Sequence, residues 1–171
     1  MINIQNLSKH ITAHEAWGKS QTARRHNIDN SPTLAHLVNM ENLSVSFFEP
    51  LREHFKHPID ISSFYRSKKL NKRIGGASKS DHMTGEAIDL DRDKYSTGPS
   101  NAELFHYIKD NLRYYKLIAE FPKDGNPGWI HISYMKEDSL NDKKIAMIAV
   151  RSKGKTSYLP YKGHEYKVNT K

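Results

Sequence analysis

The first third of the chain has apolar residues at helical spacing. Thr12 and Glu15 form a capping box that predicts a short helix over residues 13–25. The dipeptide Ser31–Pro32 is a cap followed by a first-turn proline, and it predicts the start of a second helix. Because proline lacks an N–H group, we expect Pro50 to kink this helix or to divide it in two. The apolar positions that recur at helical spacing along it are Leu37, Met40, Leu43, Phe47, Leu51 and Phe55.

Beyond Pro58 the pattern changes to short runs rich in β-formers. Strands are predicted over residues 59–65, 86–91, 115–120 and 129–135. The basic stretch 68–76 predicts a helical turn followed by a loop at its glycine pair. Ser100 predicts the start of another helix, with Leu104, Tyr107, Ile108 and Leu112 on one face. The apolar stretch 145–150 is expected to complete the sheet or to form its edge.

The length of 171 residues favours one domain, with a core over about 10–151. Residues 152–171 form a basic carboxyl-terminal extension whose role the pattern leaves open. The segment Met1–Thr12 lacks the apolar stretch of a signal peptide, and no apolar run approaches the ~20 residues of a membrane span. We therefore expect a protein made in the cytoplasm, without a membrane span and acting as a monomer.

Charge and cysteine content limit the chemistry. The formal charge of +8 favours attraction to a polyanion, which could be nucleic acid, an anionic membrane surface or an anionic cell wall. The lysines are scattered and no nucleic-acid-binding motif is present, so no specific nucleic-acid partner is expected. The chain has no cysteine, so any metal must be bound by imidazole and carboxylate groups.

Two of the predicted strands carry candidate metal ligands. In residues 87–91 the alternation of a strand places Asp89 on the face opposite Ile88 and Leu90. In residues 129–133 the same rule places Trp129, His131 and Ser133 on the face opposite Ile130 and Ile132. His131 thus points in the same direction as Asp89. If the strands are neighbours, His82 can reach them from the loop before Asp89.

Two histidines and a carboxylate form the ligand set of a catalytic zinc site. Such sites use three protein ligands and keep a fourth position open for water, which the ion makes acidic enough to attack a carbonyl group. The spacing by itself leaves open the alternative that these histidines are structural.

The residues around these positions resemble a known family. Residues 80–89, SDHMTGEAID, resemble the S-x-H-x-x-G-x-A-x-D signature of the D-alanyl-D-alanine carboxypeptidase family of zinc peptidases. Residues 129–131, WIH, resemble the W-x-H that supplies the third ligand in that family. Upstream, residues 63–67 with Asn71 and the pair Gly75–Gly76 resemble the S-x-Y-R-S, N and G-G pattern of the zinc D-Ala-D-Ala carboxypeptidase branch.

The resemblance implies an α+β fold of the hedgehog/DD-peptidase type, in which a small antiparallel sheet carries the zinc site and packs with helices. It implies one zinc ion, with His82, Asp89 and His131 as its ligands. It also implies hydrolysis of peptidoglycan stem peptides, often by a phage lysis enzyme (an endolysin). Arg66 and Ser80 match positions that hold the carboxylate or backbone of the substrate in relatives, which suits a guanidinium and a hydroxyl.

The general base is the point at which the sequence departs from part of the family. Many relatives have an acidic residue three positions before the last histidine, and this chain has Gly128 there. Glu120 is the expected catalytic base, because a similar I-x-E precedes W-x-H in the carboxypeptidase branch. Asp124 is the second choice, and either carboxylate could instead be merely solvated. Asp91 is considered as a partner that orients a ligand imidazole.

Several alternatives remain open at this point. The bond cut could be that of a D-Ala-D-Ala carboxypeptidase or of an L-Ala-D-Glu endopeptidase. The missing acid at Gly128 also allows a non-catalytic module that binds the cell wall or belongs to a virion. A basic nucleic-acid binder is the third class. As an enzyme, the protein is expected to act on the cell wall. Release of the protein through a separate membrane pore is one route by which it could reach the wall.

Overall fold

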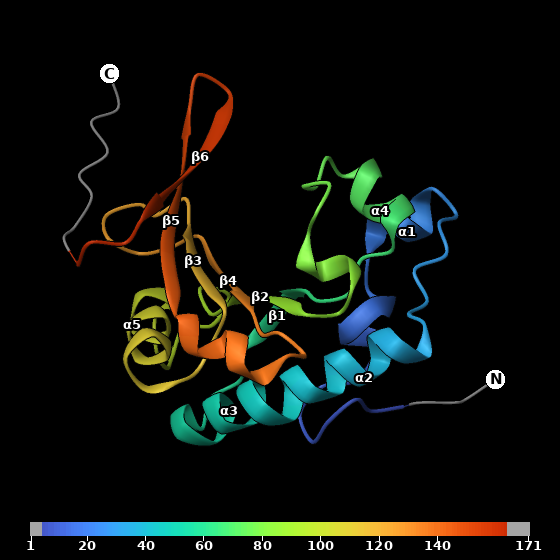
Figure 1. Ribbon diagram of the computed structural model, residues 1–171, viewed down its shortest axis with the longest axis horizontal. Coiled ribbons are helices and arrows are strands. Elements are labelled where there is room, and N and C mark those ends of the chain that lie inside the picture. Colours follow the sequence, from blue (N-terminus) through green and yellow to red (C-terminus); the bar gives the residue numbers. More distant parts are fainter. Residues whose placement is uncertain (1–4, 164–171) are drawn as a thin grey trace.

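The computed structural model describes residues 5–163 (Figure 1). The start of the segment Met1–Thr12 and the end of the extension 152–171 lie outside the described residues. Six strands form one sheet in the order β1-β2-β4-β3-β5-β6. All neighbours are antiparallel except β3 and β5, which are parallel, so the expected α+β class is confirmed and the sheet is mostly antiparallel. The strands are β1 (Asp60–Ser63), β2 (Ala87–Asp91), β3 (Lys116–Glu120), β4 (Trp129–Ser133), β5 (Ile145–Ser152) and β6 (Lys155–Pro160).

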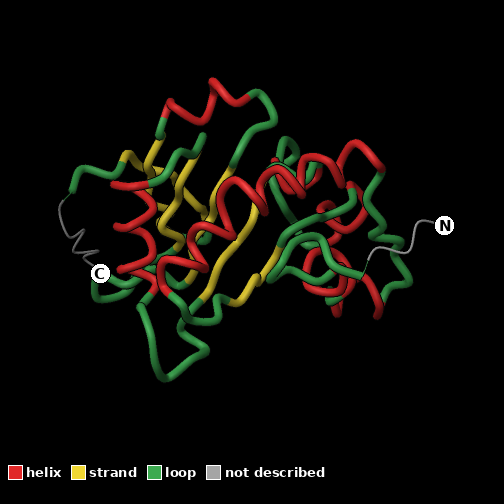
Figure 2. The backbone as a smooth tube through the Cα atoms, turned by 90° about the horizontal axis from the view of Figure 1, so that it is seen from below, coloured by secondary structure: helices red, strands yellow, loops and turns green. Residues whose placement is uncertain are grey.

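One long helical segment crosses the sheet, as the tube in Figure 2 shows. It consists of α2 (Leu34–Leu43), a π-helical turn η2 (Ser44–Phe48) and α3 (Glu49–Phe55). Pro50 marks the predicted boundary. It lies two residues after the π-helical turn, whose last hydrogen bond runs from the N–H of Glu49 to the carbonyl of Ser44, so the missing N–H falls where the hydrogen-bond pattern already changes.

The core lies between this segment, α5 (Asn101–Asn111) and one face of the sheet. Ser100 caps α5, as predicted, and the structure adds a capping box with Glu103. Helical side chains and alternate strand residues form one buried cluster because each element has one apolar face. Its fully buried members include Met40, Leu43, Leu51, Ile88, Leu90, Leu104, Ile108, Leu117, Ile130 and Ile132.

The amino-terminal helices differ from the prediction. The helix expected over 13–25 is two short elements, η1 (His14–Gly18) and α1 (Gln21–Arg25), because Ser20 is extended and its hydroxyl caps α1. The capping box of Thr12 and Glu15 is present. The cap of α2 is Thr33 and not Ser31, since the Thr33 hydroxyl accepts the N–H of His36.

The remaining short elements are α4 (Lys68–Arg73), η3 (Asp81–Met83) and η4 (Asp138–Lys143). The stretch 68–76 forms the predicted helical turn and loop. Beyond β5 the chain forms a hairpin with β6, a strand that sequence analysis did not predict. No helix within residues 5–163 is both long enough and apolar enough to cross a membrane.

Candidate metal centre

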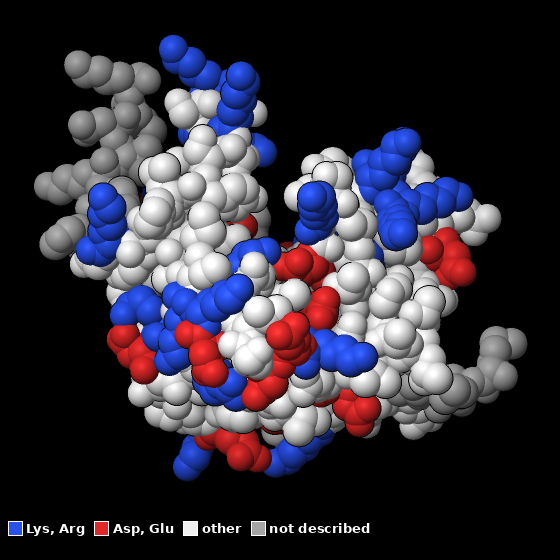
Figure 3. Space-filling model, viewed as in Figure 1, with Lys and Arg blue, Asp and Glu red and all other residues white. Residues whose placement is uncertain are grey.

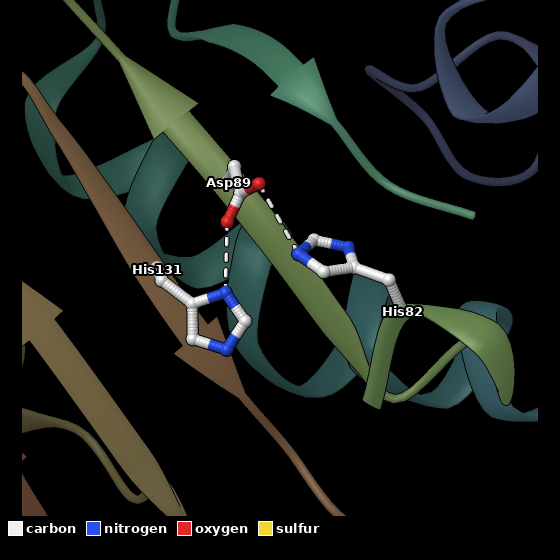
Figure 4. A group of neighbouring side chains, drawn as sticks. All are labelled: His82, Asp89 and His131. Atoms are coloured by element: carbon white, nitrogen blue, oxygen red, sulfur yellow. Dashed lines mark hydrogen bonds and ion pairs between the residues drawn. The ribbon is translucent and has the colours of Figure 1, made fainter. Parts of the chain in front are cut away.

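Asp89 and His131 are direct partners across two neighbouring strands. The antiparallel register of β2 and β4 places them opposite each other, while Ile88 and Ile132 form the adjacent pair on the core side. Oδ1 of Asp89 lies 2.8 Å from Nδ1 of His131 (Figure 4). The predicted alternation and the predicted proximity of the two strands are both confirmed.

His82 approaches from η3 and completes the group. Its Nε2 lies 3.1 Å from Oδ2 of Asp89, and its side chain is almost fully buried. The other ring nitrogen, Nδ1, is 2.6 Å from the carbonyl oxygen of Phe64 and must donate its proton to that oxygen. This hydrogen bond orients the ring and leaves a lone pair on Nε2.

Gly85 allows η3 to pack close enough to deliver His82. Its φ is +78°, in the left-handed region that favours glycine. A Cβ at this position would lie 2.7 Å from the carbonyl oxygen of His36 and 2.7 Å from Cγ of Met40, both on α2. The glycine of the family signature is therefore required by close contact between the turn before β2 and the long helix.

The three side chains fit a metal ion. One ligand atom from each of them lies within 4.8 Å of the others. Nε2 of His82 is buried and makes no hydrogen bond with any described residue, although it faces a carboxylate oxygen. A lone pair that faces a carboxylate is unfavourable unless a cation lies between them. His82, Asp89 and His131 are therefore suited to hold a divalent ion.

The pKa shifts of His82 and Asp89 also suit a cation. Burial lowers the pKa of His82, which keeps the ring neutral. Burial works against ionisation of Asp89, but positive charge and hydrogen bonds from the His82 and His131 rings outweigh it and hold the pKa of this carboxyl well below its ordinary value; a cation bound to the three side chains would act in the same direction. Neutral imidazoles and an ionised carboxylate are the forms that bind a metal.

A chain of hydrogen bonds sets the tautomer of His131. Lys116 donates to Oδ2 of Asp81 at 2.9 Å, and Ser133 donates to the same oxygen at 2.7 Å. With its proton committed to Asp81, the Ser133 hydroxyl accepts from Nε2 of His131 at 3.1 Å. In the neutral ring, the form that binds a metal, the lone pair of His131 is thus on Nδ1, toward Asp89. Sequence analysis assigned no role to Ser133 or Asp81, although strand alternation had placed Ser133 on the same face as His131.

The metal group lies in a groove of about 440 Å³. In Figure 3 the groove is the hollow between two projections, with acidic groups visible low in it. Glu120, at the end of β3, lines this groove and is 7% exposed. Burial raises the pKa of Glu120 to about 7, with smaller effects from His131, Asp89 and Arg66. A carboxyl with this pKa can exchange a proton near neutral pH.

The other acidic positions lie differently. Asp124 is exposed in the turn between β3 and β4 and is not among the residues that line the groove. The N–H of Gly128 bonds to the carbonyl oxygen of Glu120. Gly128, where many relatives have an acidic residue, is therefore next to Glu120, the acidic residue of this chain. Asp91 does not hold a ligand imidazole as considered above. Its carboxylate accepts hydrogen bonds from the Asn101 side chain and from the N–H of Asp93, because β2 ends there and the chain turns away from the site.

Arg66 and Ser80 both line the groove. The guanidinium of Arg66 lies 3.4 Å from Oδ2 of Asp89, and its Nε is buried without a hydrogen-bond partner among the described residues. Ser80 precedes η3 and its hydroxyl does not cap that turn. Both side chains therefore have donor groups that no described residue uses.

Fold and site together define a small α+β metallopeptidase, in which two imidazoles and one carboxylate share a groove with a carboxyl able to exchange a proton. Comparison with protein-family models matches residues 9–116 to Peptidase M15. This match covers more than half of the chain, and the chain belongs to the Peptidase M15 family of metallopeptidases. The matched region includes Arg66, Ser80, His82 and Asp89 and ends before Glu120 and His131. A comparison with curated proteins finds no match.

Proposed function

We propose that this protein hydrolyses peptide bonds in the stem peptides of bacterial peptidoglycan, with one zinc ion held by His82, Asp89 and His131. The observation that carries the proposal is the convergence of these three ligand atoms with Glu120 in one groove. Imidazole and carboxylate ligands suit zinc, and a three-ligand set is typical of catalytic sites. When bound, the ion would polarise the scissile carbonyl and make a water molecule more acidic.

Glu120 is the proposed general base. Its carboxyl has a pKa of about 7 because of burial, so it can accept a proton from the attacking water and return it to the leaving amine. No other carboxylate among the groove-lining residues is available. Asp89 is committed to the metal, and Asp81 accepts hydrogen bonds from Lys116 and Ser133.

Arg66 and Ser80 are the proposed substrate-binding residues. Arg66 can present unused N–H groups to a carboxylate, since its only side-chain hydrogen bond to a described residue is the one with Asp89 at 3.4 Å. Ser80 can donate its hydroxyl to the peptide backbone. A stem peptide has carboxylates beside both of the bonds under consideration, D-Ala-D-Ala and L-Ala-D-Glu, and both bonds fit this arrangement.

The charges around the groove favour an anionic peptide. Figure 3 shows basic groups on both projections that flank the hollow. On one side the exposed cations are Lys68, Lys69, Lys72, Arg73 and Lys79, and on the other side they are Arg151, Lys153 and Lys155. Such rims raise the local concentration of a negatively charged substrate. We further propose that the protein acts at the cell wall, as a lysis enzyme would.

The test is hydrolysis of purified peptidoglycan by metal-free and zinc-restored protein, with mass spectrometry of the released ends. We expect zinc-dependent release by the native protein, none by His131→Ala and a loss of at least about 100-fold with Glu120→Gln. The mass of the products identifies the bond. Zinc-dependent cleavage that survives Glu120→Gln would remove Glu120 as the base. Absence of cleavage with full zinc occupancy would favour the non-catalytic wall-binding module instead.

A further inference from the structure

The hairpin of β5 and β6 projects from the sheet beside the groove (Figure 1). Every residue of β6 is exposed, including Tyr158 at 51% and Leu159 at 39%. Burial of a core therefore does not account for this strand. It also lies outside the residues that match the family model, 9–116. Two of its residues, Thr156 and Tyr158, nevertheless line the groove that holds the metal group.

The sheet register places Tyr158 in the same row as the proposed base. Trp129 pairs with Glu120, Glu120 with Ala149, and Ala149 with Tyr158. Side chains of directly paired residues lie on the same face of a sheet, so the Tyr158 ring and the Glu120 carboxylate share the groove face. Ala149, the residue between them in the row, is fully buried and does not line the groove, whereas Glu120 and Tyr158 both do.

The Tyr158 hydroxyl is available to a ligand. It makes no hydrogen bond with another described side chain, and its ring is about half exposed on the groove side. Burial raises the pKa of Tyr158, and the Glu120 and Asp89 carboxylates raise it further. The phenol thus remains protonated at neutral pH and acts as a donor.

We propose that Tyr158 is a substrate-contacting residue, whose hydroxyl donates a hydrogen bond to a carbonyl or carboxylate oxygen of a peptide bound in the groove that Tyr158 and Glu120 both line. The hairpin then forms the wall of the groove opposite Arg66 and Ser80, so that the peptide is held from both sides. This inference rests on the proposed peptide hydrolysis and adds to it a residue that contributes to substrate selection.

The test compares Tyr158→Phe and Tyr158→Ala with Ser157→Ala, a neighbouring change on the other face of the same strand. In steady-state hydrolysis of a soluble stem peptide, we expect Tyr158→Phe to lower kcat/KM by about 3- to 10-fold, the effect of one lost hydrogen bond, mainly through KM. Tyr158→Ala should lower it further. Ser157→Ala should match the native protein, and zinc content should be the same in all four.

A second measurement separates this inference from the proposed function. The same peptide is titrated calorimetrically into the zinc-loaded Glu120→Gln protein, with and without Tyr158→Phe. Weaker binding with Tyr158→Phe supports the contact whether or not the native protein cleaves. Equal binding with and without Tyr158→Phe overturns the role of Tyr158. If the native protein cleaves, an equal kcat/KM for native protein and Tyr158→Phe overturns it as well, and both results leave the proposed function intact. A native protein that never cleaves contradicts the proposed function, and the titration then decides the role of Tyr158 by itself.

Discussion

Nδ1 of His131 lies 2.8 Å from Oδ1 of Asp89, and the hydrogen bond between Nε2 of His131 and Ser133 places the proton of the ring on the far side. In the neutral, metal-binding form of the ring, a lone pair therefore faces the carboxylate. The same relationship holds between Nε2 of His82 and Oδ2 of Asp89. Both contacts become favourable when a cation lies between the partners, which ties the stability of this region to metal binding.

Ser133→Ala should weaken zinc binding by roughly 10- to 100-fold, as loss of a ligand-orienting partner does. The hydroxyl that fixes the His131 tautomer would be gone, and the Asp81 carboxylate would lose a donor. The measurement is competition for zinc with a chelator of known affinity. Ser139→Ala, an exposed serine on η4, is the matched control. Equal affinity in the two variants would mean that Ser133 does not orient the ligand.

Zinc should raise the thermal midpoint of the native protein. A ligand that binds only the folded state at about 100 times its Kd contributes about 2.7 kcal/mol. His131→Ala removes one of three ligands and should lose most of this shift, whereas the native protein with magnesium should show little, because magnesium prefers oxygen ligands. Differential scanning calorimetry measures all three. An equal shift for zinc with His131→Ala would place the ion elsewhere.

The pH dependence of stability in the metal-free protein should report on Glu120. Its folded pKa, about 7, is above the ordinary value of a glutamate, so the contribution of this group is fully present at low pH and is lost as the pH rises through 7. Glu120→Gln should therefore be more stable than the native protein at pH 8, by on the order of 1–3 kcal/mol. Near pH 4 the difference should vanish. Denaturant titrations at the two pH values test this prediction. If Glu120→Gln were more stable than the native protein only at low pH, the raised pKa assigned to Glu120 would be wrong.

Gly85→Ala should destabilise the protein more than Gly75→Ala. Both glycines have positive φ, +78° and +72°, and share the backbone cost of about 1–2 kcal/mol. Only at Gly85 would the new methyl group meet His36 and Met40 at 2.7 Å, which adds about 1–3 kcal/mol of overpacking. Urea unfolding gives both values. Zinc affinity should also fall with Gly85→Ala, since His82 follows the movement of η3; equal losses in the two variants would refute the packing argument.

Several features of this protein could be predicted from local pattern alone. Alternation in residues 87–91 and 129–133 placed Asp89 and His131 opposite their apolar neighbours, and the structure confirms it. The cap at Ser100 and the spacing of Met40, Leu43 and Leu51 correctly predicted α5 and the long helix. Each of these signals depends on residues a few positions apart, which is the range over which backbone geometry repeats.

Other features depended on contacts between distant segments. The apolar positions through Phe47 fit one continuous helix, so the pattern did not distinguish the π-helical turn before Pro50, and the exposed strand β6 has no strong apolar period. The hydrogen bonds from Lys116 and Ser133 to Asp81 join residues 35 and 52 positions apart. Residue spacing along the chain does not predict contacts between segments so far apart.

The sequence by itself determined which groups are available as ligands and which face of each strand they occupy. It did so because the absence of cysteine limits the ligand types and because strand alternation is local. Only the tertiary structure decided that β2 lies beside β4, that burial raises the pKa of Glu120, and that Tyr158 shares its row. Register, burial and charge proximity arise from packing between distant segments, and packing is settled only when the whole chain folds.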